Sequence, residues 1–117
     1  MNNDYEISVG EPWDFKGPDG PNRILAKAEG TVTGPDRPNW QGEYLLLRVK
    51  IPFKMNDELV TLLVAAPRSA GDTLSKMMSE GCPAGIARFR EGLDLRAGDK
   101  FEAEQVEYCI LGSVRPI

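Results

Sequence analysis

Short apolar stretches alternate along the chain with loops rich in glycine and proline, a pattern typical of a protein built from strands. Apolar and polar residues alternate over 5–9, 23–33 and 44–51, which predicts half-buried strands because neighbouring side chains in a strand point to opposite faces. Residues 58–66 are apolar on both faces, as expected for a strand that is covered on both sides. The glycines and prolines of 10–22 predict an irregular segment.

The strand predicted at 44–51 shows the clearest alternation. Its two faces carry, respectively, Leu45, Leu47, Val49 and Ile51, and Tyr44, Leu46, Arg48 and Lys50. Residues 52–57 are expected to turn the chain into the strand at 58–66.

An apolar stripe at helical spacing predicts a single short helix, formed by Leu74, Met77 and Met78. Asp72 or Ser69 is expected to cap its first turn, since both carry side-chain oxygens that accept from free backbone N–H groups. Gly81 is placed to end the helix in the left-handed conformation.

After the helix the pattern returns to strands. A strand is predicted over 84–90, a turn region over 91–99 and a last strand over 100–111. The inward phase of the last strand changes near Glu104 and Gln105, which predicts a β-bulge or a sharp bend there. A bend of this kind helps a strand to curl around a closed barrel.

The order of these elements is that of a small barrel: a first additional strand, three strands, a helix and two strands. This order resembles the OB-like barrel in topology alone, and other α+β barrels remain open. We predict a mainly β (α+β) protein, a small OB-like antiparallel barrel of five to six strands with one short helix between strands. Residues 1–117 are expected to form a single domain with an irregular segment at 10–22.

The composition is ordinary for a globular protein, with 117 residues of which 41% are hydrophobic and 27% charged. The net charge of −4 is concentrated in residues 1–22, where five acidic side chains face one lysine. We find no signal peptide and no apolar span of membrane length, and therefore predict a cytoplasmic protein that does not engage a membrane. Cys82 and Cys109 are expected to be reduced, but a disulfide stays open if the fold brings them together.

The chain contains no histidine, which removes the side chain that titrates near neutral pH and is the commonest general base and metal ligand. Serine or cysteine nucleophiles activated by histidine are excluded. Cys82 follows the predicted helix, where the helix dipole raises a thiol pKa, so we expect a poor nucleophile. We predict a non-enzymatic protein with no catalytic residues, no metal site and no cofactor.

The first candidate binding site lies in the irregular segment, at Trp13, Asp14, Phe15 and Asp19. Large aromatic side chains in a loop are typical anchors of a protein interface. The same aromatic pair can instead fold back and plug an open end of the barrel. The acidic side chains would steer the protein towards a basic partner.

The second candidate site mixes cationic and aromatic residues across one loop and one strand face: Arg37, Trp40, Tyr44, Arg48, Lys50 and Phe53. In an OB-like barrel this face is where single-stranded nucleic acid lies, with bases stacked on aromatic rings and phosphates held by cations. Arg88 and Arg90 extend this surface, protect a sheet edge, or pair with Glu102 and Glu104; we favour the last two roles.

The sequence therefore predicts a cytoplasmic binding protein that engages a protein partner, in the manner of an inhibitor or immunity protein. This comparison rests on physical character rather than on a motif. The alternative is an OB-like module that binds single-stranded nucleic acid. The oligomeric state stays open, including whether the first strand pairs within the chain or with a second copy.

Overall fold

The computed structural model describes residues 3–9, 23–36, 42–55, 57–69 and 71–117. The elements of this part of the chain are, in order, β1 (Asp4–Val9), β2 (Arg23–Thr33), β3 (Glu43–Met55), β4 (Glu58–Pro67), helix α1 (Leu74–Ser79), β5 (Cys82–Phe89), the 3₁₀ helix η1 (Ala103–Gln105) and β6 (Val106–Pro116).

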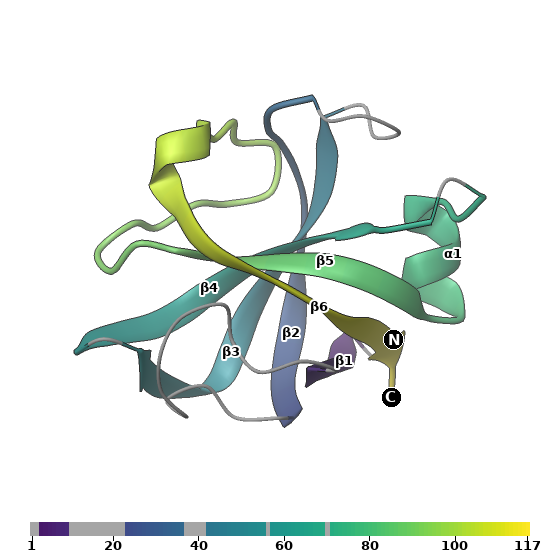
Figure 1. Cartoon of the computed structure of the whole chain (residues 1–117), viewed down its shortest axis with the longest axis horizontal. Helices are drawn as coiled ribbons and strands as arrows, with labels where there is room; N and C mark the ends of the chain where they lie inside the picture. The colour runs from purple at the N-terminus through teal and green to yellow at the C-terminus, as the bar shows by residue number, and fades with distance from the viewer. Residues whose placement is uncertain (1–2, 10–22, 37–41, 56, 70) are drawn as a thin grey trace.

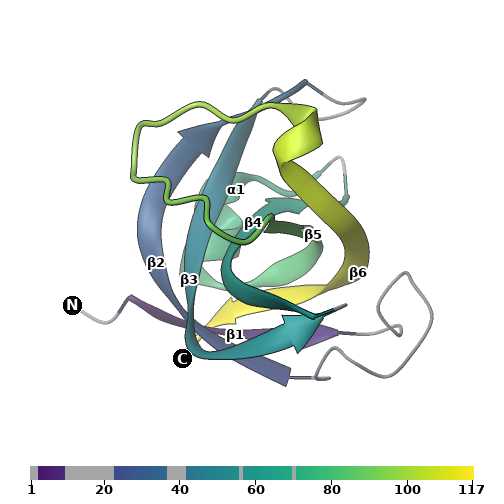
Figure 2. The same cartoon turned by 90° about the vertical axis from the view of Figure 1, so that its left-hand side faces the viewer.

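The described strands form one closed barrel in which every strand is antiparallel to its neighbours (Figures 1 and 2). β6 returns to pair with β1, from Tyr5 opposite Pro116 to Val9 opposite Gly112, so the ring closes within one chain. Strands that are consecutive in the sequence are neighbours around the whole ring, the up-and-down arrangement of a barrel. The predicted small antiparallel barrel with one short helix between strands is confirmed.

The interior of the barrel is filled by the inward faces of all its strands. Ile7, Leu45 and Leu63 are each fully buried there, and they come from β1, β3 and β4. Helix α1 adds Leu74 and Met77, which are buried in the same cluster. The interior positions are apolar and alternate with outward positions along each strand. The side chains that face the barrel interior could therefore be predicted directly from the sequence.

A second apolar cluster lies on the outside of the barrel wall, under the segment of residues 90–105, which we call the cover segment. This segment crosses over β2 and β3 on its way from β5 to η1 (Figure 2). Leu95 and Phe101 of the cover segment are buried against Tyr44 and Leu46 of β3. The outer face of β3, opposite the core-facing leucines, is therefore also buried at Tyr44 and Leu46.

The cover segment is also tied to the end of β2 by backbone hydrogen bonds. The Thr33 N–H donates to the Asp99 carbonyl at 2.9 Å, and the Phe101 N–H donates to the Thr33 carbonyl at 2.8 Å. The Gly98 N–H donates to the Thr31 carbonyl at 2.8 Å. These hydrogen bonds satisfy N–H and C=O groups at the end of β2 that would otherwise bind water.

The prediction of a turn over 52–57 is wrong, because β3 continues to Met55. It does so through a wide bulge: Arg48 lies opposite Leu62, whereas Phe53 lies opposite Val60. The β3 side of this interval is longer than the β4 side, so the extra residues are pushed out of the ladder. Pro52 falls inside the bulge, where the missing N–H of proline breaks no regular pairing.

The other element boundaries differ in smaller ways. The predicted strand at 100–111 begins only at Val106, because residues 103–105 form η1; the change of phase near Glu104 is thus a helical turn. The helix cap is Thr73, whose side chain accepts from the Lys76 N–H at 3.0 Å, rather than Asp72 or Ser69. Gly81 does adopt a positive φ of 91°, as predicted for the residue that ends the helix.

Candidate functional site

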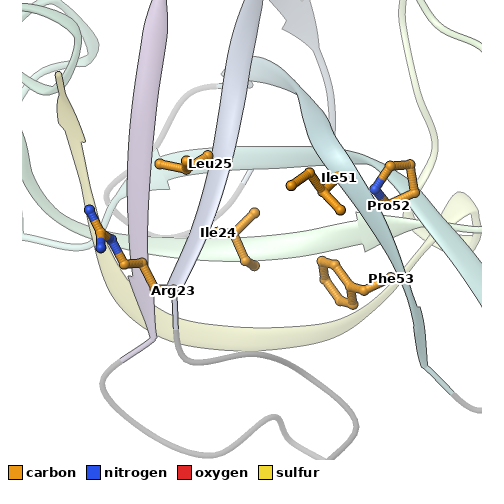
Figure 3. Close-up of a pocket in the computed structure, with 6 residues that line it drawn as sticks. All are labelled: Arg23, Ile24, Leu25, Ile51, Pro52 and Phe53. Carbon is orange, nitrogen blue, oxygen red and sulfur yellow. The ribbon is translucent and has the colours of Figure 1, made fainter.

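An apolar pocket with a volume of about 410 Å³ opens between the start of β2 and the far end of β3. Its described lining is formed by Arg23, Ile24, Leu25, Ile51, Pro52 and Phe53. Figure 3 shows Ile24, Ile51 and Phe53 pointing into the space between the two strands.

The bulge of β3 creates this pocket. The ladder between β2 and β3 runs from Thr33 opposite Glu43 to Ala26 opposite Val49, and among the described residues it extends no further towards Arg23. Beyond Val49 the chain of β3 leaves the ladder, so the two strands separate. Side chains that would pack across a continuous sheet instead line a cavity.

The mouth of the pocket exposes apolar side chains to solvent. Ile51 is 80% exposed and Leu25 is 39% exposed. Pro52 is also exposed, while Phe53 is half-buried and packs against the interior cluster. Single exposed apolar residues are common, but here three of them, Leu25, Ile51 and Pro52, lie together around one cavity.

Arg23 of the pocket lining belongs to a charged cluster with Glu6 and Arg115. Glu6 of β1 is only 3% exposed and lies between Arg23 of β2 and Arg115 of β6, and it accepts hydrogen bonds from both guanidinium groups. The Arg115 Nε–Glu6 Oε1 distance is 2.7 Å. The hydrogen bond from Arg115, assisted by Arg23, lowers the pKa of Glu6 below its usual 4.5. One carboxylate therefore faces two cations in this cluster.

The lowered pKa of Glu6 predicts a loss of stability in acid. A carboxyl group whose pKa is lower in the folded state stabilises that state above its unfolded pKa, and this contribution is lost as pH falls through the folded-state pKa. We expect the urea midpoint to fall as pH decreases below the ordinary value of 4.5. The Glu6→Gln variant should show a shallower dependence, measured by urea unfolding at a series of pH values. An unchanged slope in that variant would contradict the assignment.

The residues predicted to bind nucleic acid do not form one exposed face. Tyr44 was expected on an exposed surface, but it is only 4% exposed, and its hydroxyl donates to the Pro35 carbonyl at 2.6 Å. Its ring meets Phe101 edge to face at 5.2 Å, so the cover segment occupies the position that a base would need. Phe53 lines the pocket instead.

The cations of the same predicted face pair with acidic side chains. Arg48 Nη2 lies 3.1 Å from Asp94 Oδ1, and its Nε lies 3.5 Å from Glu29 Oε1. Lys50 Nζ lies 2.7 Å from Asp4 Oδ2. Phosphates would have to compete with these carboxylates. Arg37 and Trp40 lie outside the described residues.

The residues of the first candidate site, Trp13, Asp14, Phe15 and Asp19, also lie outside the described residues. The aliphatic members of the pocket were missed by the sequence analysis. The available signal was Pro52 next to Ile51, because a proline within a strand pattern indicates an edge or a bulge.

Arg88 has a different role from the surface or edge residue that the sequence suggested. It shares the inward face of β5 with Ile86 and is fully buried. Its Nη1 lies 3.1 Å from Glu58 Oε1, and its Nη2 lies 2.8 Å from Glu107 Oε2. Arg90 Nη1 also reaches Glu107 Oε1, at 2.6 Å. The predicted pairing with Glu102 and Glu104 side chains is thus replaced by pairing with carboxylates on β4 and β6.

Cys82 is a free, buried thiol in the interior cluster. Burial raises the pKa of this thiol, which agrees with the predicted poor nucleophile. The cause is desolvation in the first place rather than the helix dipole.

Within the described part of the chain, no group of three or more acidic or cysteine side chains is placed to hold a metal ion. None of the described helices is both long and apolar enough to cross a membrane. No family model matches the chain, and neither the curated proteins nor the solved structures contain a significant match.

Proposed function

We propose that this chain is a non-enzymatic binding protein whose pocket between β2 and β3 takes up an apolar side chain of a protein partner. The observation that carries the proposal is the exposure of Ile51 and Leu25 around a cavity of about 410 Å³. When a partner covers exposed aliphatic side chains, little favourable interaction with water is lost. Their burial then adds the hydrophobic contribution to the free energy of binding. The bulge of β3 holds the cavity open before binding, which reduces the entropic cost of association.

Single-stranded nucleic acid is the weaker alternative. Sequence-tolerant binding of single strands needs exposed aromatic rings beside free cations. Among the described residues of the predicted face, Tyr44 is buried and Arg48 and Lys50 contact carboxylates. The pocket is lined mainly by aliphatic side chains, which suit another protein better than a base.

The expectation that acidic residues of 1–22 steer the protein towards a basic partner stays a prediction. Three of these acidic residues, Glu11, Asp14 and Asp19, lie outside the described residues.

The substitution Ile51→Lys tests the proposed function. We expect it to weaken partner binding by roughly tenfold or more, because the lysine places a charge at the apolar mouth of the pocket. The measurement is affinity capture from a lysate of the native host, with quantitative mass spectrometry of the proteins retained by each variant. Stability should change by no more than about 0.5 kcal/mol, since Ile51 is 80% exposed.

Leu111→Lys is the matched control. Leu111 is a 47% exposed leucine on β6 that does not belong to the described lining of the pocket, so the same change in charge should leave capture intact. Equal capture by the wild type and Ile51→Lys would show that the pocket is not the binding site. Retention of nucleic acid in place of protein, sensitive to Arg48→Ala, would favour the alternative.

A further inference from the structure

We propose that Glu6 is a positioning residue for the pocket: it holds the guanidinium of Arg23 towards β1, so the mouth stays apolar and the site selects uncharged apolar side chains of the partner. The inference rests on the proposed function and goes beyond it by naming a residue outside the lining that sets the specificity of the pocket. It follows from the register of β1, the burial of Glu6 and the direction of the Arg23 side chain.

The register of three strands places Glu6 within reach of two arginines. Glu6 of β1 lies opposite Leu25 of β2, so Arg23, two residues before Leu25, is its diagonal neighbour. On its other side Glu6 lies directly opposite Arg115 of β6. Side chains at such positions share one face of a sheet, and diagonal neighbours are within reach of long side chains. Because the adjacent Ile7 belongs to the interior cluster, the shared face is the outer one.

The two oxygens of the Glu6 carboxylate serve different arginines. Arg23 donates from Nε to Oε2, and Arg115 donates from Nε to Oε1 at 2.7 Å. The Glu6 side chain is only 4% exposed although it lies on the outer face, whereas the Arg23 side chain is 70% exposed. A hydrogen bond between ionised groups is stronger than one between neutral groups. Glu6 therefore holds Arg23 in one direction.

That direction leads away from the mouth of the pocket. Arg23 is the one charged residue of the described lining. Figure 3 shows its guanidinium turned away from Ile51 and Phe53. The hydrogen bond to Glu6 draws this charged end towards β1. An apolar side chain of a partner can thus enter without burying a charge, which would cost desolvation free energy.

Loss of the Glu6 charge would release Arg23 towards the mouth. Among the described residues, Glu6 is the carboxylate with which Arg23 is paired. Arginine side chains lay their carbon stems on exposed apolar surface and keep the charged end in water, and the mouth of this pocket offers such surface at Leu25 and Ile51. An entering side chain would then have to displace the arginine. Apparent affinity falls by the fraction of molecules in which the mouth is open.

The experiment compares two fluorescent probes of similar shape on the full-length protein, uncharged N-phenyl-1-naphthylamine and anionic 1-anilinonaphthalene-8-sulfonate. The wild type should bind the uncharged probe, and Ile51→Lys should weaken this binding by roughly tenfold. Glu6→Gln should weaken it by roughly threefold, the effect of a mouth that Arg23 covers for about two thirds of the time. Binding of the anionic probe to Glu6→Gln should be unchanged or tighter, because the released guanidinium attracts its sulfonate.

Two further variants separate positioning from a general structural role. The double variant Glu6→Gln with Arg23→Gln should regain the wild-type affinity for the uncharged probe, because no guanidinium remains to cover the mouth. Arg115→Gln is the matched control. Arg115 shares Glu6 but does not belong to the described lining, so its loss should leave the Arg23–Glu6 pair and the affinity unchanged. If Glu6 only supported the fold, the double variant would bind no better than Glu6→Gln.

The outcomes separate the inference from the proposed function. Equal affinity of the wild type and Glu6→Gln for the uncharged probe, or a double variant that does not recover, would overturn the inference and leave the pocket as an apolar site. A wild type that does not bind the uncharged probe, or an Ile51→Lys variant that binds it equally well, would overturn both.

Discussion

We expect Phe101→Ala to lower the free energy of unfolding by about 4 kcal/mol, the cost typical of deleting a buried phenylalanine. Phe101 is 2% exposed and meets the rings of Tyr44 and Phe89 edge to face, each at 5.2 Å. Its ring also approaches Gly34 so closely that a Cβ on that glycine would lie 2.2 Å from it. These contacts join β2, β3, β5 and the cover segment, so an alanine would leave a cavity that the surrounding strands cannot fill.

Urea unfolding of the wild type and the variant measures this effect. Ile51→Ala is the control, because Ile51 is 80% exposed and its truncation should change stability by no more than about 0.5 kcal/mol. Hydrogen exchange adds a local test: the Phe101 and Gly98 N–H groups, which donate to β2, should lose protection first. A cost of less than about 1 kcal/mol for Phe101→Ala would show that the second cluster contributes little to stability.

The second large effect is expected for Arg88→Leu, which should cost about 3 kcal/mol, because removing one partner of a buried ion pair leaves the other uncompensated. Arg88 is fully buried, whereas the side chains of Glu107 and Glu58 are 21% and 38% exposed. Because these two carboxylates are partly hydrated, we expect the loss of unfolding free energy to lie towards the lower end of the range typical of buried ion pairs. The pKa of Glu58, which the hydrogen bond from Arg88 lowers, should rise in the variant.

The control for Arg88 is Arg90→Ala. The side chain of Arg90 is 50% exposed although it contacts the same Glu107, so its loss should cost only about 0.5 kcal/mol. The double variant Arg88→Leu with Glu107→Gln should recover part of the lost stability, because it removes a carboxylate along with its partner. Equal costs for Arg88→Leu and Arg90→Ala would show that burial of Arg88 has no energetic consequence.

Much of the barrel could be predicted from local alternation. The range 23–33 was predicted as one strand and is β2, and the apolar residues at 58–66 form most of β4. Alternation has a period of two in a strand wherever one face is buried, so it depends only on neighbours along the chain. Gly81 was identified for the same reason, because the end of a helix is a local requirement.

The two faces of β3 show where this reasoning fails. Tyr44 and Leu46 were set opposite the core-facing leucines, and the structure buries them under Phe101, more than fifty residues later in the chain. Arg88 was assigned to a surface by its charge, but the register of β5 places it beside Ile86 on the inward face. No local pattern distinguishes a cation paired inside a barrel from one in water.

The candidate site depends even more on distant contacts. Ile51 was predicted on the same face as Leu45, yet the bulge between Arg48 and Phe53 turns it outward to 80% exposure. The bulge is a mismatch between β3 and β4, so it exists only when both strands are in place.

The sequence by itself determined that this is a small barrel of antiparallel strands with one helix, because hydrophobic alternation, turn residues and helix capping are local properties. The absence of histidine likewise removed whole classes of catalysis without reference to any fold. Only the tertiary structure decided which polar residues are buried, where β2 and β3 separate and which apolar side chains remain in water. These properties arise from contacts between segments far apart in the chain, and the pattern of any one segment does not contain them.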